Sequence, residues 1–218
     1  MEISYRHIET LIEEGESETL DFKHCITSSR KIAVAISAFA NRYGGILLIG
    51  IKDNGKPAKI NIEEECYMLE AAVNLCSPIP EMSIQVLAYR GKEIVYAVIE
   101  KMKDDVVFCP MDDQKQMAFI RVKDENLQAH WVWVQAHLKD RKEQATKFSY
   151  KIEEEIVLKT LDKFAPISQQ ELKKHTKINF HRLGKILVML LKMNVLRIDH
   201  AERESQFSLN RSGVNKIL

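Results

Sequence analysis

The first stretch of the chain shows the apolar spacing of amphipathic helices. Tyr5, Ile8 and Ile12 recur at helical spacing, and Gly15 stands where a C-cap is expected to end that helix. A second helix is predicted to start after an N-cap at Ser28 or Ser29 and to run to about residue 43, with residues 32, 36 and 39 on one stripe. A third is predicted over residues 62–75 and a fourth from Leu127 to Leu138.

Strand patterns lie between these helices. The apolar run Ile46–Ile51 is too short and uniform for an exposed helix, and it predicts a central strand that is buried on both faces. Shorter strands are predicted over residues 19–23 and 118–122, and residues 84–89 and 93–100 are expected to form a hairpin. The first part is therefore expected to be a mixed α/β (α+β) domain.

After residue 150 the pattern becomes helix, helix, helix and hairpin. A helix is predicted over residues 152–164, and Ser168 to Glu171 form a capping box for a short second helix. Asn179 is expected to cap a third helix that ends near residue 193, before strands at 195–198 and 205–209. This order is that of a small winged helix-turn-helix domain.

Composition and charge support two soluble domains. The 218 residues carry 32 basic and 31 acidic side chains, which excludes a uniformly basic nucleic-acid coat. Residues 151–218 hold 13 basic and 8 acidic residues, whereas the other 150 residues hold 19 and 23. We place the boundary in the polar run at 139–147, which gives domains 1–145 and 151–218.

Targeting and cysteine patterns predict a cytoplasmic protein. The N-terminus lacks the basic and apolar regions of a signal peptide, and no apolar run approaches the roughly 20 residues of a membrane span. The scattered cysteines have no metal or redox spacing and are interpreted as buried thiols. The histidines also lack metal spacing.

The third helix of the second domain carries the clearest candidate chemistry. One arc of its surface is apolar, and His181, Arg182, Lys185 and Lys192 fall in a separate arc. This arrangement is typical of a recognition helix. Arg182 is the best candidate for a guanine contact, and the lysines suit phosphates. Further positive charge comes from Lys173, Lys174 and Lys177, whereas the expected wing tip is acidic. The alternative is a solvated helix face in a dimerisation domain.

The first domain contains three notable segments, in this order along the chain: Glu16–Lys23 (ESETLDFK), Ala38–Gly45 (AFANRYGG) and Ile46–Gly55 (ILLIGIKDNG). The segments and their order resemble the signature of the Schlafen AlbA-like family, which is often described as DNA-binding. The segment Phe119–Val122 (FIRV) is similar to a later strand of that family. The resemblance covers about residues 10–130, and in bacteria such a domain often precedes a winged helix.

The resemblance implies two different activities. Bacterial members are often described as transcriptional regulators, whereas animal Schlafen relatives include RNA endonucleases with metal-binding carboxylates. Carried over by motif, these catalytic and metal-binding positions are Glu16, Asp21 and Asp53. Carboxylates suit Mg²⁺ or Mn²⁺. On a straight strand Glu16 and Asp21 face opposite sides, so they meet only if the chain bends near Ser17.

Other candidate sites are weaker. Residues 50–57 nearly fit a phosphate-binding loop, but Pro57 replaces the Ser or Thr that holds Mg²⁺, so ATP is not expected. Asn41 is expected to cap its helix, and Gly45 to allow a turn without a Cβ clash. Trp131 is assigned to the core and Trp133 to base stacking or an interface.

These patterns predict a cytoplasmic, homodimeric protein that binds nucleic acid and has no cofactor. The leading function is that of a DNA-binding transcriptional regulator. RNA is the second possible ligand. The first domain would supply dimerisation, a second binding surface or a ligand sensor. The alternatives are an endoribonuclease that uses Mg²⁺ or Mn²⁺, and a protein-interaction module that binds no nucleic acid.

Overall fold

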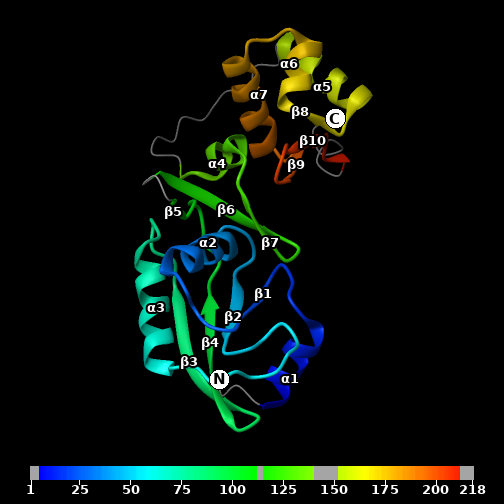
Figure 1. Ribbon diagram of the computed structural model, residues 1–218. Helices are drawn as coiled ribbons and strands as arrows, with labels where there is room; N and C mark the ends of the chain where they lie inside the picture. The colour runs from blue at the N-terminus through cyan, green and yellow to red at the C-terminus, as the bar shows by residue number, and fades with distance from the viewer. Residues whose placement is uncertain (1–4, 112–114, 140–151, 212–218) are drawn as a thin grey trace. The chain divides into compact units, whose positions relative to one another are not determined.

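The computed structural model describes residues 5–111, 115–139 and 152–211 (Figure 1). The chain forms two compact units, Met1–Gln128 and Ala129–Leu218. The division lies earlier than the boundary expected from the charge shift, because helix α4 (Trp131–His137) places Val132 in the core of the second unit. Most of the expected linker, residues 140–147, lies outside the described residues.

The first unit is a mixed α/β structure, as expected. Its four-stranded sheet has the order β1-β2-β4-β3, with β1 parallel to β2 and the other pairs antiparallel. A second, antiparallel sheet has the order β5-β6-β7. The elements are α1 (Tyr5–Glu14), β1 (Leu20–Lys23), α2 (Ser29–Ala40), β2 (Gly45–Ile49), α3 (Ile62–Asn74), β3 (Met82–Tyr89), β4 (Lys92–Ile99), β5 (Phe108–Pro110), β6 (Gln116–Val122) and β7 (Glu125–Gln128).

Strand β2 is central and buried on both faces, which confirms the interpretation of the apolar run. Leu47 and Ile49 pack into a core that includes α2 and α3, while Leu48 packs into a second core with Ile8 of α1. Figure 1 shows α2 and α3 along the sheet, with α1 near the lower end of its strands. Alternate side chains of one strand therefore join two separate apolar layers.

The turn into β2 depends on a missing side chain. A Cβ on Gly45 would lie 2.3 Å from Cδ1 of Phe39, and Gly44 has a φ of +75°. Only glycine adopts such a backbone conformation freely and allows this close approach. The expected structural role of the Gly-Gly pair is confirmed.

Two details of the first unit differ from the expectations. The amphipathic helix predicted from Leu127 begins only at Trp131, because Leu127 belongs to β7 and pairs with Ile120 of β6. Of the four cysteines, only Cys76 and Cys109 are buried, and Cys25 is exposed. Burial raises the pKa of the Cys76 thiol to about 12 and that of Cys109 to about 11, so both stay protonated.

The second unit packs its helices against a small antiparallel sheet of order β8-β10-β9. Its core includes Val157, Leu172, Leu187 and Phe207. The capping box at Ser168 and the side-chain cap at Asn179 form as predicted. Besides α4, the elements are α5 (Ile152–Phe164), β8 (Ile167–Ser168), α6 (Gln169–Thr176), α7 (Phe180–Lys192), β9 (Leu196–Asp199) and β10 (Gln206–Leu209).

Candidate functional site

Helix α7 has the two faces that its sequence predicts. The buried side chains Leu183, Ile186, Leu187 and Leu190 hold the helix on its own unit. The exposed side chains on the opposite side include His181, Lys185 and Lys192. Because apolar burial fixes one face, the basic face is presented in a constant orientation.

Helix α6 and the following turn add three exposed lysines, Lys173, Lys174 and Lys177. Lys177 is the C-cap of α6 and adopts the left-handed conformation, with a φ of +56°. The chain turns through residues 177–179 and enters α7 at once. This short connection places two cationic helices next to each other in the sequence and in the same unit.

Arg182 does not occupy the position expected of a guanine-reading side chain. Its Nε lies 2.6 Å from Oε2 of Glu153, and its Nη2 lies 3.1 Å from Oε1 of Glu154. The Glu154 side chain is buried, so the guanidinium neutralises a carboxylate that has little access to water. Arg182 thus joins α7 to α5, and a base contact would first require breaking both ion pairs.

The hairpin between β9 and β10 is acidic at its tip, as the sequence predicts. Asp199, Glu202 and Glu204 are exposed there beside Arg203. Arg197, on β9, donates a hydrogen bond from Nε to Oγ of Ser208. This charge pattern disfavours phosphate contact by the hairpin and leaves α6 and α7 as the cationic surface.

The two tryptophans occupy the reverse of their predicted environments. Trp133 is 8% exposed and stacks on His137, with ring centroids 4.1 Å apart. Trp131 is 39% exposed. The predictions for both residues are wrong, because α4 starts at Trp131 and turns Val132 and Trp133 toward the interior.

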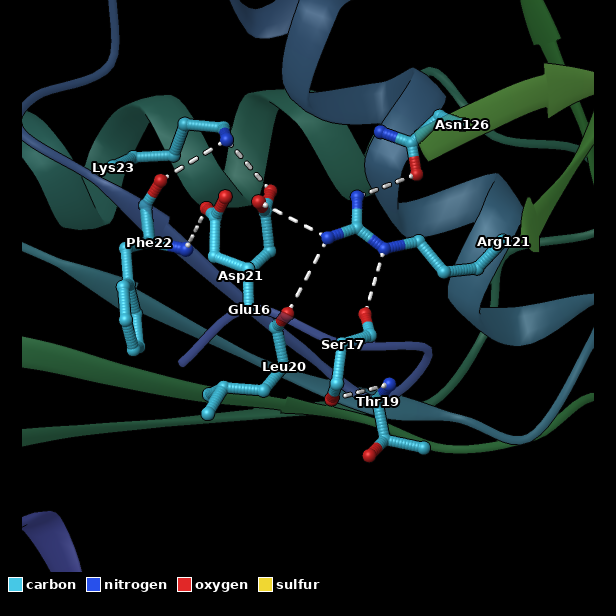
Figure 2. A network of polar contacts seen from close by, with 9 residues as sticks. All are labelled: Glu16, Ser17, Thr19, Leu20, Asp21, Phe22, Lys23, Arg121 and Asn126. Carbon is cyan, nitrogen blue, oxygen red and sulfur yellow. Dashed lines mark hydrogen bonds and ion pairs between the residues drawn. The ribbon is translucent and has the colours of Figure 1, made fainter. Parts of the chain in front are cut away.

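Asp21, one of the acidic candidates of the first unit, pairs with a buried arginine that we did not predict as a site residue (Figure 2). The guanidinium of Arg121 is 1% exposed and lies 3.3 Å from Oδ1 of Asp21. It also donates to the carbonyl oxygens of Ser17 and Leu20 and to Oδ1 of Asn126. The available signal was a single arginine between apolar neighbours in a buried strand.

Asp21 is neutralised within the protein. Its Oδ2 lies 2.7 Å from Nζ of Lys23, so two cations face one buried carboxylate. Burial alone would raise the pKa of Asp21, but hydrogen bonds from Glu16 and Lys23, with the charges of Lys23 and Arg121, lower it. The carboxylate therefore stays ionised as a structural anion.

Glu16 reaches Asp21 because the chain bends between them. The N–H of Ser17 donates to the carbonyl of Leu20 over 2.9 Å, and the N–H of Phe22 donates to Oε1 of Glu16 over 2.9 Å. Burial and a hydrogen bond with Asp21 raise the pKa of Glu16. The bend near Ser17 thus brings the two carboxyl groups together, and their interaction raises the pKa of Glu16 and lowers that of Asp21.

Asp53 shares a pocket with one member of this pair, Glu16. It is exposed in the turn after β2 and lines a pocket of about 400 Å³ with Glu13, Glu16 and Asp124, whereas Asp21 does not line it. Within the described part of the chain, no three His, Cys, Asp or Glu side chains are grouped so as to hold a metal ion. The arrangement does not support a metal site formed by Glu16, Asp21 and Asp53.

The segment that resembles a phosphate-binding loop is a tight turn. The N–H of Lys52 donates to the carbonyl of Lys56, and the N–H of Lys56 donates to Oδ1 of Asn54. The next helix, α3, begins only at Ile62. A phosphate-binding loop leads directly into a helix, so this geometry gives no support to ATP binding.

Asn41 has a larger structural role than a helix cap. Its Nδ2 donates to the carbonyl oxygens of Val107 and Phe119, and its Oδ1 accepts from the N–H of Val107. These bonds connect the end of α2 to residues beside and within the second sheet. The side chain is 7% exposed, so it is a buried connector and is not available to a ligand.

None of the helices within residues 5–111, 115–139 and 152–211 has the length and apolar character that crossing a membrane requires.

Comparison with solved structures finds distant similarity. The crystal structure of the DIP2311 protein from Corynebacterium diphtheriae is 13% identical, with a TM-score of 0.42. The match covers 77% of the present chain but only 35% of the Corynebacterium chain. A solution structure from Nitrosomonas europaea, the N-terminal domain of a protein described as related to the ATP-dependent DNA helicase RecG, is 17% identical with a TM-score of 0.38. That match covers 51% of the present chain and 80% of the other.

The comparison with curated proteins gives no significant match. The family model described as "Schlafen, AlbA_2" matches residues 16–130. This range contains the bend at Ser17, the Gly-Gly turn, the central strand β2 and the buried Arg121, which are the features that define the first unit. Because the match spans more than half of the residues of the chain, the chain belongs to the Schlafen AlbA_2 family.

Proposed function

We propose that this protein binds nucleic acid, DNA in the first place, through α6 and α7, and that it acts as a transcriptional regulator. The observation that carries the proposal is the exposed basic face of α7 together with the lysines of α6 and its C-terminal turn. Phosphate-driven binding needs several accessible cations, and these residues supply exposed cations from two consecutive helices.

The architecture of the second unit supports the same proposal. Two helices joined by a short turn, followed by a small antiparallel sheet, match the order of a winged helix-turn-helix. In such domains the second helix of the pair enters the major groove. Here that helix is α7, so Lys185 is expected near a phosphate or a base edge. The acidic hairpin is expected to stay away from the backbone.

A homodimer remains part of this proposal, because a single recognition helix reads few bases and two half-sites extend the site. Membership of the Schlafen AlbA_2 family is consistent with nucleic-acid binding. The carboxylates of the first unit do not favour metal-dependent cleavage, since Lys23 and Arg121 already neutralise Asp21.

Salt dependence of binding tests the proposal. Fluorescence anisotropy of a labelled duplex would be measured from 50 to 300 mM salt for the wild type, for Lys185→Ala and for Lys159→Ala. Lys159 is an exposed lysine of α5 that pairs with Glu155 and serves as the control. We expect Lys185→Ala to reduce the salt slope by about 1 and the control to leave it unchanged. The absence of binding, or binding that ignores salt, would favour the protein-interaction module instead.

A further inference from the structure

An exposed aromatic surface lies at the start of α7. Trp131 is 39% exposed and Phe180 is 43% exposed, and their ring centroids are 6.3 Å apart. Both side chains belong to the second unit. Two large aromatic rings in contact, each leaving about two fifths of its surface in water, form a patch that core packing alone does not explain.

The indole of Trp131 is held in place from two sides. A Cβ on Gly184 would lie 2.1 Å from its Cη2 and 2.5 Å from its Cζ2, so the ring rests directly on the backbone of α7. Its Nε1 donates to Oε1 of Gln169 over 3.0 Å. The missing side chain at Gly184 therefore makes room for the ring, and the hydrogen bond fixes its orientation before any ligand arrives.

The basic face of α7 runs alongside this ring. Phe180 and Gly184, which contact Trp131, are one helical turn apart on the same stripe. His181 and Lys185 follow each of them by one position, so they occupy the neighbouring stripe, about 100° around the helix. Both are exposed. The aromatic surface and the cations thus border each other along the first turns of α7.

We propose that Trp131, with Phe180 beside it, is a stacking platform for an unpaired nucleobase, and that the preferred ligand of the second unit contains single-stranded nucleic acid. This inference rests on the proposed function and names its ligand class. Single-strand binders combine a cationic track for phosphates with aromatic rings for base faces. In an intact duplex the base faces are already stacked, so only an unpaired base can use the ring.

The two tryptophans of the chain make the test direct. Trp133→Phe removes the buried indole and leaves Trp131 as the only tryptophan. In this variant, single-stranded oligonucleotides of 12 nucleotides are expected to quench the fluorescence on binding, and the matched duplex is expected to quench it less. Because Trp133 is buried, Trp131→Phe should show little quenching with the same oligonucleotides.

Affinity gives the second measurement. Trp131→Leu, which keeps an apolar side chain but removes the ring, is expected to weaken single-strand binding at least about fivefold and to leave the salt slope unchanged. Trp131→Phe should restore most of the loss. Circular dichroism melting of each variant identifies any that fail to fold, and the quenching of Trp133→Phe keeps the test decisive in that case.

The possible outcomes distinguish the stacking platform at Trp131 from the proposed nucleic-acid binding through α6 and α7. Salt-dependent binding that needs Lys185, with no quenching of Trp131 and no preference for single strands, would overturn the stacking platform and keep the proposed function. No binding to any nucleic acid would overturn both. Quenching together with single-strand preference supports the stacking platform and nucleic-acid binding by α6 and α7, and it argues against insertion of α7 into the major groove of a duplex.

Discussion

Because Gly184 contacts Trp131, we expect Gly184→Ala to destabilise the second unit when Trp131 is present and to stabilise it when Trp131 is replaced by alanine. Gly184 lies within α7, where replacing glycine by alanine ordinarily stabilises a helix by about 1 kcal/mol. Here the new Cβ would lie 2.1 Å from Cη2 of Trp131, whereas ordinary contact begins near 3.4 Å. The indole would have to move by about 1.3 Å.

The magnitude follows from two opposing effects. Overpacking of this kind costs up to about 3 kcal/mol, and a displaced indole also strains its hydrogen bond to Gln169. Set against the gain of about 1 kcal/mol in helix propensity, Gly184→Ala should destabilise the second unit by about 2 kcal/mol. In a Trp131→Ala background the clash is gone, and the same substitution should stabilise it by about 1 kcal/mol. The coupling between the two positions is then about 3 kcal/mol.

A double-mutant cycle measures this coupling. Urea unfolding would be followed by the fluorescence of Trp133, which is buried in the same unit and present in all four proteins. Equal stabilisation of the wild-type and the Trp131→Ala backgrounds by Gly184→Ala would refute the clash between Gly184→Ala and the indole. That result would mean that the indole can leave α7 at no cost, and a fixed stacking ring would lose its basis.

Three other substitutions test contacts of both units. Arg121→Met should destabilise the first unit by about 3–5 kcal/mol in urea unfolding, because it removes a cation from buried Asp21. Adding Asp21→Asn should recover part of the loss. Equal stability of Arg121→Met and the wild type would refute this prediction. Asn41→Ala removes the donor to the carbonyl of Phe119 and the acceptor for the N–H of Val107, and it should cost about 1–3 kcal/mol in thermal unfolding, whereas an unchanged melting temperature would argue against the connector role. Burial lowers the pKa of His130. Its Nδ1 accepts a hydrogen bond from the N–H of Val132, so this nitrogen must carry no proton. The unfolded chain therefore takes up the proton first, so stability should fall as pH drops below about 6.5. His130→Asn, which can still cap α4, should flatten that part of the pH profile, and an identical profile would exclude His130 as its source.

The buried pair of Arg121 and Asp21 gives the first unit a fixed polar centre. Because Arg121 also bonds the carbonyls of Ser17 and Leu20, it holds the bend that precedes β1. Its guanidinium carbon lies 5.2 Å from the ring centroid of Phe39, the same ring that excludes a side chain at Gly45. Each of these contacts stabilises the local path of the chain.

Short-range patterns in the sequence determined most of the secondary structure. The capping box at Ser168, the cap at Asn179 and the two faces of α7 depend on residues within a few positions of one another. The burial of β2 on both faces follows from its uniform apolar run. The exposed lysines of α6 and α7 were predictable for the same reason, because they lie opposite an apolar stripe.

Only the tertiary structure decided which of the candidate side chains are available to a ligand. Arg182 pairs with Glu153, 29 positions away, and Asp21 with Arg121, 100 positions away. Trp131 is exposed and Trp133 is buried because α4 packs on α7, a contact that no local period encodes. The spacing of apolar residues along a helix or strand shows which of its faces is apolar. Ion pairs and aromatic contacts between residues far apart in the sequence depend on how the elements pack.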